Sequence, residues 1–131
     1  MEILIFFLLL AFFFWTIFAF VLFIKSEKFP ENRKKFFLKK ISEVKNFSDN
    51  EKKILSYDKI LDQLLNEKKY SWTLWEKLKK NWNIFLNVNE IWFAHKLRNK
   101  IAHDIHPNIS EKDFFKAEKI FLRELKNLLK N

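Results

Sequence analysis

Residues 3–24 form an almost uninterrupted apolar run, ILIFFLLLAFFFWTIFAFVLFI, in which Thr16 is the single polar residue. As an α-helix this run would be about 33 Å long, at about 1.5 Å per residue, and the hydrocarbon core of a bilayer is about 30 Å thick. A cleavable signal peptide would start with basic residues and end in a small-residue cleavage site, whereas here Glu2 precedes the run and KSEKF follows it. The pattern therefore predicts an uncleaved transmembrane anchor over residues 1–25, with the lipid bilayer as a partner.

The residues that flank the apolar run predict the orientation of this anchor. No basic side chain precedes the run, whereas the segment after it is rich in them: Lys25, Lys28, Arg33, Lys34, Lys35, Lys39 and Lys40. Basic flanks of a membrane helix stay on the cytoplasmic side. We therefore expect a single-pass protein of the inner (cytoplasmic) membrane, with its C-terminal domain in the cytoplasm.

Residues 26–47 form a basic juxtamembrane linker or amphipathic segment. Its cluster RKKFFLKK mixes three apolar residues with five basic ones: Arg33, Lys34, Lys35, Lys39 and Lys40. Near an anionic lipid surface each basic residue contributes about 1 kcal/mol, so this cluster is a candidate membrane-surface site. In the alternative interpretation, the apolar residues Phe36, Phe37 and Leu38 pack on the domain that follows. The sequence favours neither alternative.

From residue 48 to residue 131 the pattern predicts helices only. One helix of about 18 residues is expected from the spacing of five residues on one face: Ile54, Tyr57, Leu61, Leu64 and Leu65. Capping signals mark helix starts at SDNE (48–51), TLWE (73–76), NVNE (87–90) and SEKD (110–113), and Pro107 ends the third helix. The expected fold class is therefore all-α: an N-terminal transmembrane helix followed by a small four-helix bundle.

Composition excludes several classes of function. The chain has no cysteine, which excludes disulfides, thiolate catalysis and cysteine-based zinc sites. It also has no glycine, which excludes phosphate-binding loops of the Walker and Rossmann types. The net charge of +9 permits nucleic-acid binding without pointing to it.

The predicted third helix carries the most informative polar pattern. On a helical wheel with about 100° per residue, the core side gathers four apolar residues: Phe93, Ala94, Leu97 and Ile101. The opposite side carries a stripe at intervals of four residues: His95, Asn99 and His103. Trp92 lies in the same arc, and Arg98 flanks the stripe. A tryptophan on a face away from the core needs a partner, so we expect this side to meet another chain or a ligand.

The motif R-N-x-x-x-H in the third of four helices resembles the HEPN superfamily. The signature of that superfamily is an arginine, usually followed by a polar residue, and a histidine a few residues further on. Arg98, Asn99 and His103 stand at these three positions in RNKIAH. The resemblance covers residues 48–131 as a HEPN-like domain and leaves residues 1–47 outside it. It implies metal-independent cleavage of RNA by a homodimer, with no cofactor.

The resemblance also implies a catalytic role for each of the three residues. Attack of a ribose 2′-hydroxyl on the adjacent phosphate needs a base, an acid and stabilisation of negative charge. His103 would transfer protons, as histidines do near neutral pH, and Arg98 would hold phosphate oxygens. Asn99 would hold the histidine or the substrate, and a two-fold dimer would supply the second histidine. The interface or substrate-contacting residues would be Trp92, His95, Lys100 and Asp104.

Other interpretations of the same residues stay open. A histidine on a polar helix face is usually only solvated, and Arg98 could pair with Glu90 or Asp104. The alternative function is a non-catalytic module that dimerises, acts as a scaffold for a protein partner encoded nearby, or senses nucleotides or nucleic acids. A metal site is disfavoured because His95 and His103 are two turns apart, whereas a metal-binding pair on a helix is expected at i, i+4. The third candidate ligand of such a site would be His106.

Overall fold

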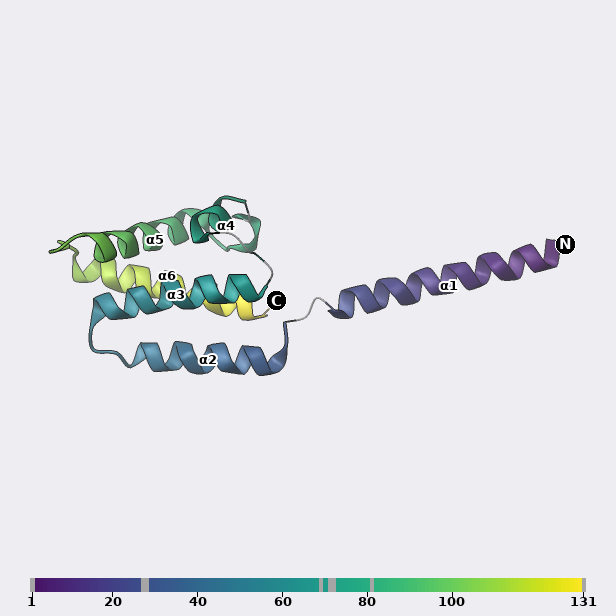
Figure 1. The fold of residues 1–131 in the computed structure, drawn as a ribbon, viewed down its shortest axis with the longest axis horizontal. Coiled ribbons are helices and arrows are strands. Elements are labelled where there is room, and N and C mark those ends of the chain that lie inside the picture. Colours follow the sequence, from purple (N-terminus) through teal and green to yellow (C-terminus); the bar gives the residue numbers. More distant parts are fainter. Residues whose placement is uncertain (1, 27–28, 69, 71–72, 81, 131) are drawn as a thin grey trace.

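The computed structural model describes residues 2–26, 29–68, 70, 73–80 and 82–130, and every regular element in these residues is a helix. In chain order the elements are α1 (Glu2–Ser26), α2 (Glu31–Lys45), α3 (Asn50–Glu67), α4 (Leu74–Lys80), the 3-10 helix η1 (Trp82–Ile84), α5 (Val88–His103) and α6 (Glu111–Lys130). Figure 1 shows α2 to α6 gathered into one bundle and α1 extending away from it. The described part of residues 48–131 thus has the helical character that the sequence predicts.

The N-terminal helix requires a correction of the expected fold class and location. Among the helices of the described residues, none is long and apolar enough to cross a membrane. For the part of the chain that the structure describes, the predictions of a transmembrane anchor over residues 1–25 and of a single-pass inner-membrane protein are therefore wrong.

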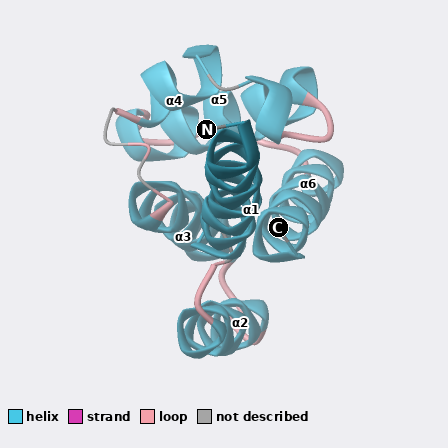
Figure 2. Cartoon of the chain, turned by 90° about the vertical axis from the view of Figure 1, so that its right-hand side faces the viewer, coloured by secondary structure: helices cyan, strands magenta, loops and turns pink. Residues whose placement is uncertain are grey.

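The bundle is built around α3, which contacts α2, α5 and α6. Figure 2 shows α3 and α6 side by side in the middle of the bundle, with α5 above them and α2 below. The ring of Tyr57 on α3 stacks on Phe121 of α6, with ring centroids 6.5 Å apart, and both side chains are fully buried. Burial raises the pKa of Tyr57 to about 12, so its hydroxyl stays protonated. The other buried hydrophobic residues of α3 are aliphatic: Ile54, Ile60, Leu61, Leu64 and Leu65.

The helix starts follow the capping chemistry that the sequence indicates. Thr73 and Glu76 cap α4 reciprocally, since the Thr73 N–H donates to the Glu76 carboxylate at 3.1 Å and the Thr73 hydroxyl accepts the Glu76 N–H at 3.4 Å. Asn87 caps α5 through its side-chain oxygen. The start of α3 differs from the expected one by a single residue. Asp49, rather than Ser48, accepts the backbone N–H three residues further on, at 3.1 Å.

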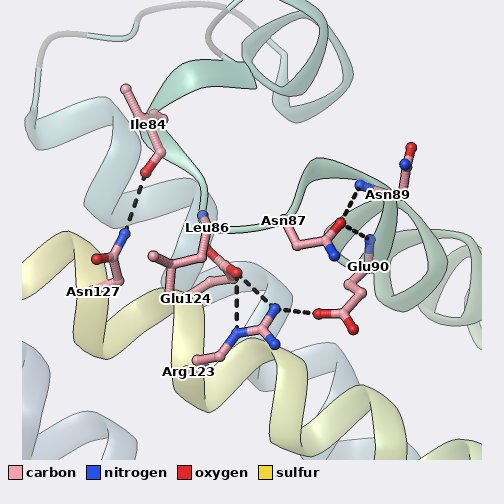
Figure 3. A network of polar contacts seen from close by, with 8 residues as sticks. All are labelled: Ile84, Leu86, Asn87, Asn89, Glu90, Arg123, Glu124 and Asn127. Atoms are coloured by element: carbon pink, nitrogen blue, oxygen red, sulfur yellow. Dashed lines mark hydrogen bonds and ion pairs between the residues drawn. The ribbon is translucent and has the colours of Figure 1, made fainter.

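A buried carboxylate fixes the chain before α5 against α6 (Figure 3). Glu124 is fully buried and accepts the backbone N–H of Leu86 at 2.9 Å. The guanidinium of Arg123 donates to Glu124 at 2.9 Å and also pairs with Glu90 in the first turn of α5. A buried charge is tolerated when it is paired and hydrogen-bonded. These contacts therefore hold the start of α5, the helix that contains RNKIAH, in a fixed place on α6.

The basic helix α2 packs on α3 through three buried residues: Phe37, Ile41 and Val44. Arg33 reaches Glu67 of α3, with Nε donating to Oε2 at 2.9 Å, and its guanidinium carbon lies 4.2 Å from the centre of the Phe36 ring. Lys40 donates to Gln63 of α3 at 2.9 Å. Two of the five basic residues that the sequence proposed for a lipid surface are thus engaged with α3. The other three are Lys34, Lys35 and Lys39.

We expect acid to weaken the contact between α2 and α3 through the pair Arg33–Glu67. Hydrogen bonding to Arg33 lowers the pKa of Glu67 from its ordinary value. A carboxylate with a lowered pKa stabilises the fold above its unfolded-state pKa, and this contribution is lost as the pH falls through the folded-state pKa. Between about pH 5 and about pH 3, the melting temperature of the wild type should therefore fall further than that of Glu67→Gln, as measured by far-UV circular dichroism.

The exposed acid Glu51 on the same helix provides the matched control. The variant Glu51→Gln should lose stability with acid in the same way as the wild type. If Glu67→Gln is as sensitive to acid as the wild type, the pair contributes nothing to the pH dependence of stability.

Candidate functional site

Asp58 is a buried acid in the middle of the apolar face of α3. It lies one turn after Ile54 and one turn before Leu61, and only 4% of its surface is exposed. Both of its partners come from α5: His95 Nδ1 lies 2.9 Å from Oδ1, and Arg98 Nε lies 3.0 Å from Oδ2. Because a buried carboxylate is stable only with such partners, these contacts connect α3 to α5. We call Asp58, His95 and Arg98 the α3–α5 cluster.

Arg98 is held from two sides, yet a third of its side chain (33%) is exposed. Its Nε atom is buried next to Asp58 but does not make a well-aligned hydrogen bond, so this contact is an ion pair. Its Nη1 atom donates to Asn99 Oδ1 at 2.9 Å. A guanidinium has five N–H donors in a rigid plane. The two contacts therefore orient the group and leave donors on Nη2 for a ligand.

The α3–α5 cluster lines an open cavity of about 630 Å³ between α3, the start of α4 and α5. The cavity wall combines two basic, two acidic, one imidazole, one hydroxyl and two apolar side chains: Lys59, Arg98, Asp58, Asp62, His95, Thr73, Leu55 and Leu74. Small-molecule sites commonly have volumes of about 300–1,000 Å³ and place a few polar groups on a partly apolar wall. The cavity has the size and the mixed lining of such a site.

The three residues predicted to be catalytic lie on α5, but the structure brings only two of them into contact. Arg98 and Asn99 share a hydrogen bond. His103 is exposed at the last position of α5, about 6 Å further along the helix axis than Asn99. The residues that line the cavity do not include His103. A site that uses all three residues therefore extends from the cavity edge to the end of α5.

The four residues expected at an interface or a substrate divide into two pairs. Trp92 and His95 point inward: Trp92 is half-buried, His95 is 8% exposed, and their rings meet edge to face at 6.1 Å. Lys100 and Asp104 lie near the exposed end of α5, where Lys100 Nζ donates to the carbonyl of Asn108 at 2.9 Å. Only this second pair lies beside His103 at the protein surface.

His95 differs most from the expected arrangement. The helical wheel placed it opposite the core, whereas the structure buries it against Asp58. The reason is that α5 contacts both α3 and α6, so its buried arc is wider than one apolar stripe. Phe93 lies towards α6, where the ammonium group of Lys116 is 4.4 Å from its ring centre. The wheel included Phe93, which lies on the side of α5 that faces α6, and missed His95, which lies on the side that faces α3.

Asp58 is a site residue that the helical pattern alone did not predict, although a signal for it was present. Its position, four residues after Ile54 and three before Leu61, is on the face predicted to be buried. An acid on such a face must find a partner in the fold. Arg98 turns out to be that partner, whereas Glu90, one of the two partners considered for Arg98, pairs with Arg123.

Comparisons with known proteins identify no relative from which a function could be inferred. No family model matches the chain, and neither does any curated protein or any solved structure. Among the residues that the structure describes, no three histidine, aspartate or glutamate side chains come together as metal ligands. A function is therefore inferred from the α3–α5 cluster and the exposed end of α5.

Removing the shared carboxylate should destabilise the bundle strongly. Asp58→Ala leaves His95 and Arg98 without their common partner, and breaking a buried pair in this way costs about 3 kcal/mol. We therefore expect the free energy of unfolding to fall by about that amount, as measured by urea unfolding followed by far-UV circular dichroism. The exposed neighbour provides the control, because Lys59→Ala should change it by less than about 0.5 kcal/mol. A loss below about 1 kcal/mol for Asp58→Ala would contradict a stabilising role for the cluster.

Proposed function

We propose that the chain is a HEPN-like ribonuclease that acts as a homodimer and cleaves RNA without a metal ion, through Arg98, Asn99 and His103. The observation that carries this proposal is the position and orientation of the Arg98 guanidinium. Its guanidinium is oriented by Asp58 and Asn99, borders an open cavity and keeps donors for a phosphate. An arginine with no other role would more commonly extend into solvent.

The chemistry of Arg98 fits a phosphate that gains charge during a reaction. An oriented donor needs little rearrangement when negative charge develops, which is the basis of electrostatic catalysis. The planar fork of a guanidinium suits two phosphate oxygens. Asp58 contacts Nε, whereas the terminal nitrogens carry most of the donors. Arg98 would therefore stabilise the phosphorane-like transition state, with Asn99 and Asp58 as positioning residues.

His103 would supply the proton transfer. One imidazole takes the proton of the ribose 2′-hydroxyl as that oxygen attacks phosphorus, and a second imidazole protonates the departing 5′-oxygen. The products are a 2′,3′-cyclic phosphate and a 5′-hydroxyl. Each chain offers one exposed histidine of this kind beside Asn99, so the partner's His103 would serve as the second imidazole in a two-fold dimer.

A non-catalytic role is the second candidate, and one observation favours it. Asp58 neutralises much of the charge of Arg98, and His95 completes the burial of Asp58. An arginine in such a cluster serves to position α5 on α3. The exposed end of α5 would then bind RNA or a protein partner without cutting.

An RNA cleavage assay tests the proposal. The full chain, kept in a mild detergent that covers the exposed apolar side chains of α1, is incubated with single-stranded RNA in excess chelator. We expect products that end in a 2′,3′-cyclic phosphate. Because proton transfer and charge stabilisation are each removed by one change, His103→Ala and Arg98→Ala should each lower the cleavage rate constant by at least about 100-fold.

The exposed residue Lys96 on the same helix provides the control, because Lys96→Ala should cleave as fast as the wild type. The absence of products, or products that form equally fast in His103→Ala, would rule out the catalytic proposal. RNA binding without cleavage would support the second candidate.

A further inference from the structure

The exposed face of α6 carries a row of positive charge that has no part in the site described above. We propose that this face binds an acidic helix of a protein partner. Exposed basic residues recur along α6 at alternating intervals of four and three positions, which places them on one face of the helix. These residues form the α6 stripe: Lys112, Lys116, Lys119, Arg123, Lys126 and Lys130. The stripe is about 27 Å long, at about 1.5 Å per residue.

The acids of α6 lie outside the stripe. Glu111 precedes it at the first position of the helix, and Asp113 accepts a hydroxyl hydrogen bond of 2.8 Å at the helix start. Glu118 pairs with Lys53 of α3 at 3.7 Å, and Glu124 is fully buried. The exposed face of α6 from residue 112 onward therefore presents cations with no acid of the same helix between them.

The charges of the stripe are largely unbalanced in the free chain. Like charges three or four positions apart on a helix destabilise it, and all neighbours in the stripe have the same sign. Arg123 is balanced by Glu90 and Glu124. The ammonium group of Lys116 lies 4.4 Å from the centre of the Phe93 ring. Among the residues that the structure describes, the other four members form no ion pair: Lys112, Lys119, Lys126 and Lys130. A polyanion aligned with the stripe would offset their repulsion.

The spacing of the charges matches the repeat of a helix. Successive members of the stripe are about 4.5 Å or about 6 Å apart along the helix axis. Acidic residues at the same alternating intervals on a partner helix have the same spacing, so a partner that lies along α6 would meet each cation with a carboxylate. Charge complementarity of this kind orients the partner and excludes wrong ones.

Phe115 favours a protein partner over a nucleic acid. It is 70% exposed and lies about one turn from Lys112 and from Lys119. Protein interfaces concentrate binding energy in aromatic anchors that polar residues surround. A single-stranded nucleic acid instead stacks successive bases on several aromatic side chains, and Phe115 is the only exposed large hydrophobic residue in the described part of α6. Phe115 would therefore fill an apolar pocket beside the acidic face of the partner.

Fluorescence anisotropy with the full chain in a mild, uncharged detergent tests the proposal. The probe is a labelled synthetic helix as long as the stripe, with glutamates at alternating intervals of three and four positions and leucines beside them. The reference probe has glutamine at each glutamate position. We expect the acidic helix to bind at least about tenfold more tightly than the glutamine helix, because only the acidic one balances the stripe. The double variant Lys119→Glu, Lys126→Glu and the single variant Phe115→Ala should each weaken this binding about tenfold, which is the effect of losing about 1.4 kcal/mol.

The double variant Lys45→Glu, Lys52→Glu is the matched control, because it changes the net charge equally at exposed positions of α2 and α3. It should bind the acidic helix as the wild type does, and far-UV circular dichroism checks that every variant is folded. Equal affinity for the two probes would overturn the proposal, and so would an unchanged affinity in the stripe variant. A single-stranded oligothymidylate of the same charge that binds more tightly than the acidic helix, and loses affinity in the stripe variant, would assign the stripe to nucleic acid and also overturn the proposal.

Discussion

The burial of one carboxylate, Asp58, determines how α5 lies on α3. Removing a carboxylate from water costs several kcal/mol, and the cost is offset only when charged or hydrogen-bonding partners meet it in good geometry. Asp58 finds both of its partners on α5, one turn apart, in His95 and Arg98. The helix must therefore be rotated so that these two side chains face α3. Glu124 acts in the same way at the other end of α5, where it fixes the preceding chain on α6.

The same interaction connects stability with function. Because Arg98 pairs with the buried carboxylate of Asp58, its guanidinium is held in a fixed orientation at the edge of the cavity. Preorganised donors of this kind are what phosphate recognition requires. The α3–α5 cluster would thus serve both as a structural link and as the rigid base of a phosphate site. His103, at the exposed end of α5, would add the proton-transfer group.

The sequence predicted the helix starts, which depend on neighbouring residues. It missed the side-chain pairs that depend on contacts between helices. Local hydrogen bonds define the caps at Thr73 and Asn87, so these starts were predictable. The pairing of Asp58 with His95 depends on the rotation of α5 against α3, which a wheel of one helix does not contain. The apolar run at the N-terminus gave a prediction of a membrane anchor that the described part of α1 does not support. The inward packing of Phe37 was one of two open alternatives, because the outcome depended on the position of α3.

A double-mutant cycle on Asp58 and Arg98 tests most directly whether this contact links α3 to α5. The free energies of unfolding of the wild type, Asp58→Ala, Arg98→Ala and the double variant would be measured by urea unfolding. Residues that stabilise each other show a coupling energy, and we expect at least about 1 kcal/mol for this pair. Losses that add up to within about 0.3 kcal/mol would show that the two side chains act independently. That result would contradict the central role of the buried carboxylate.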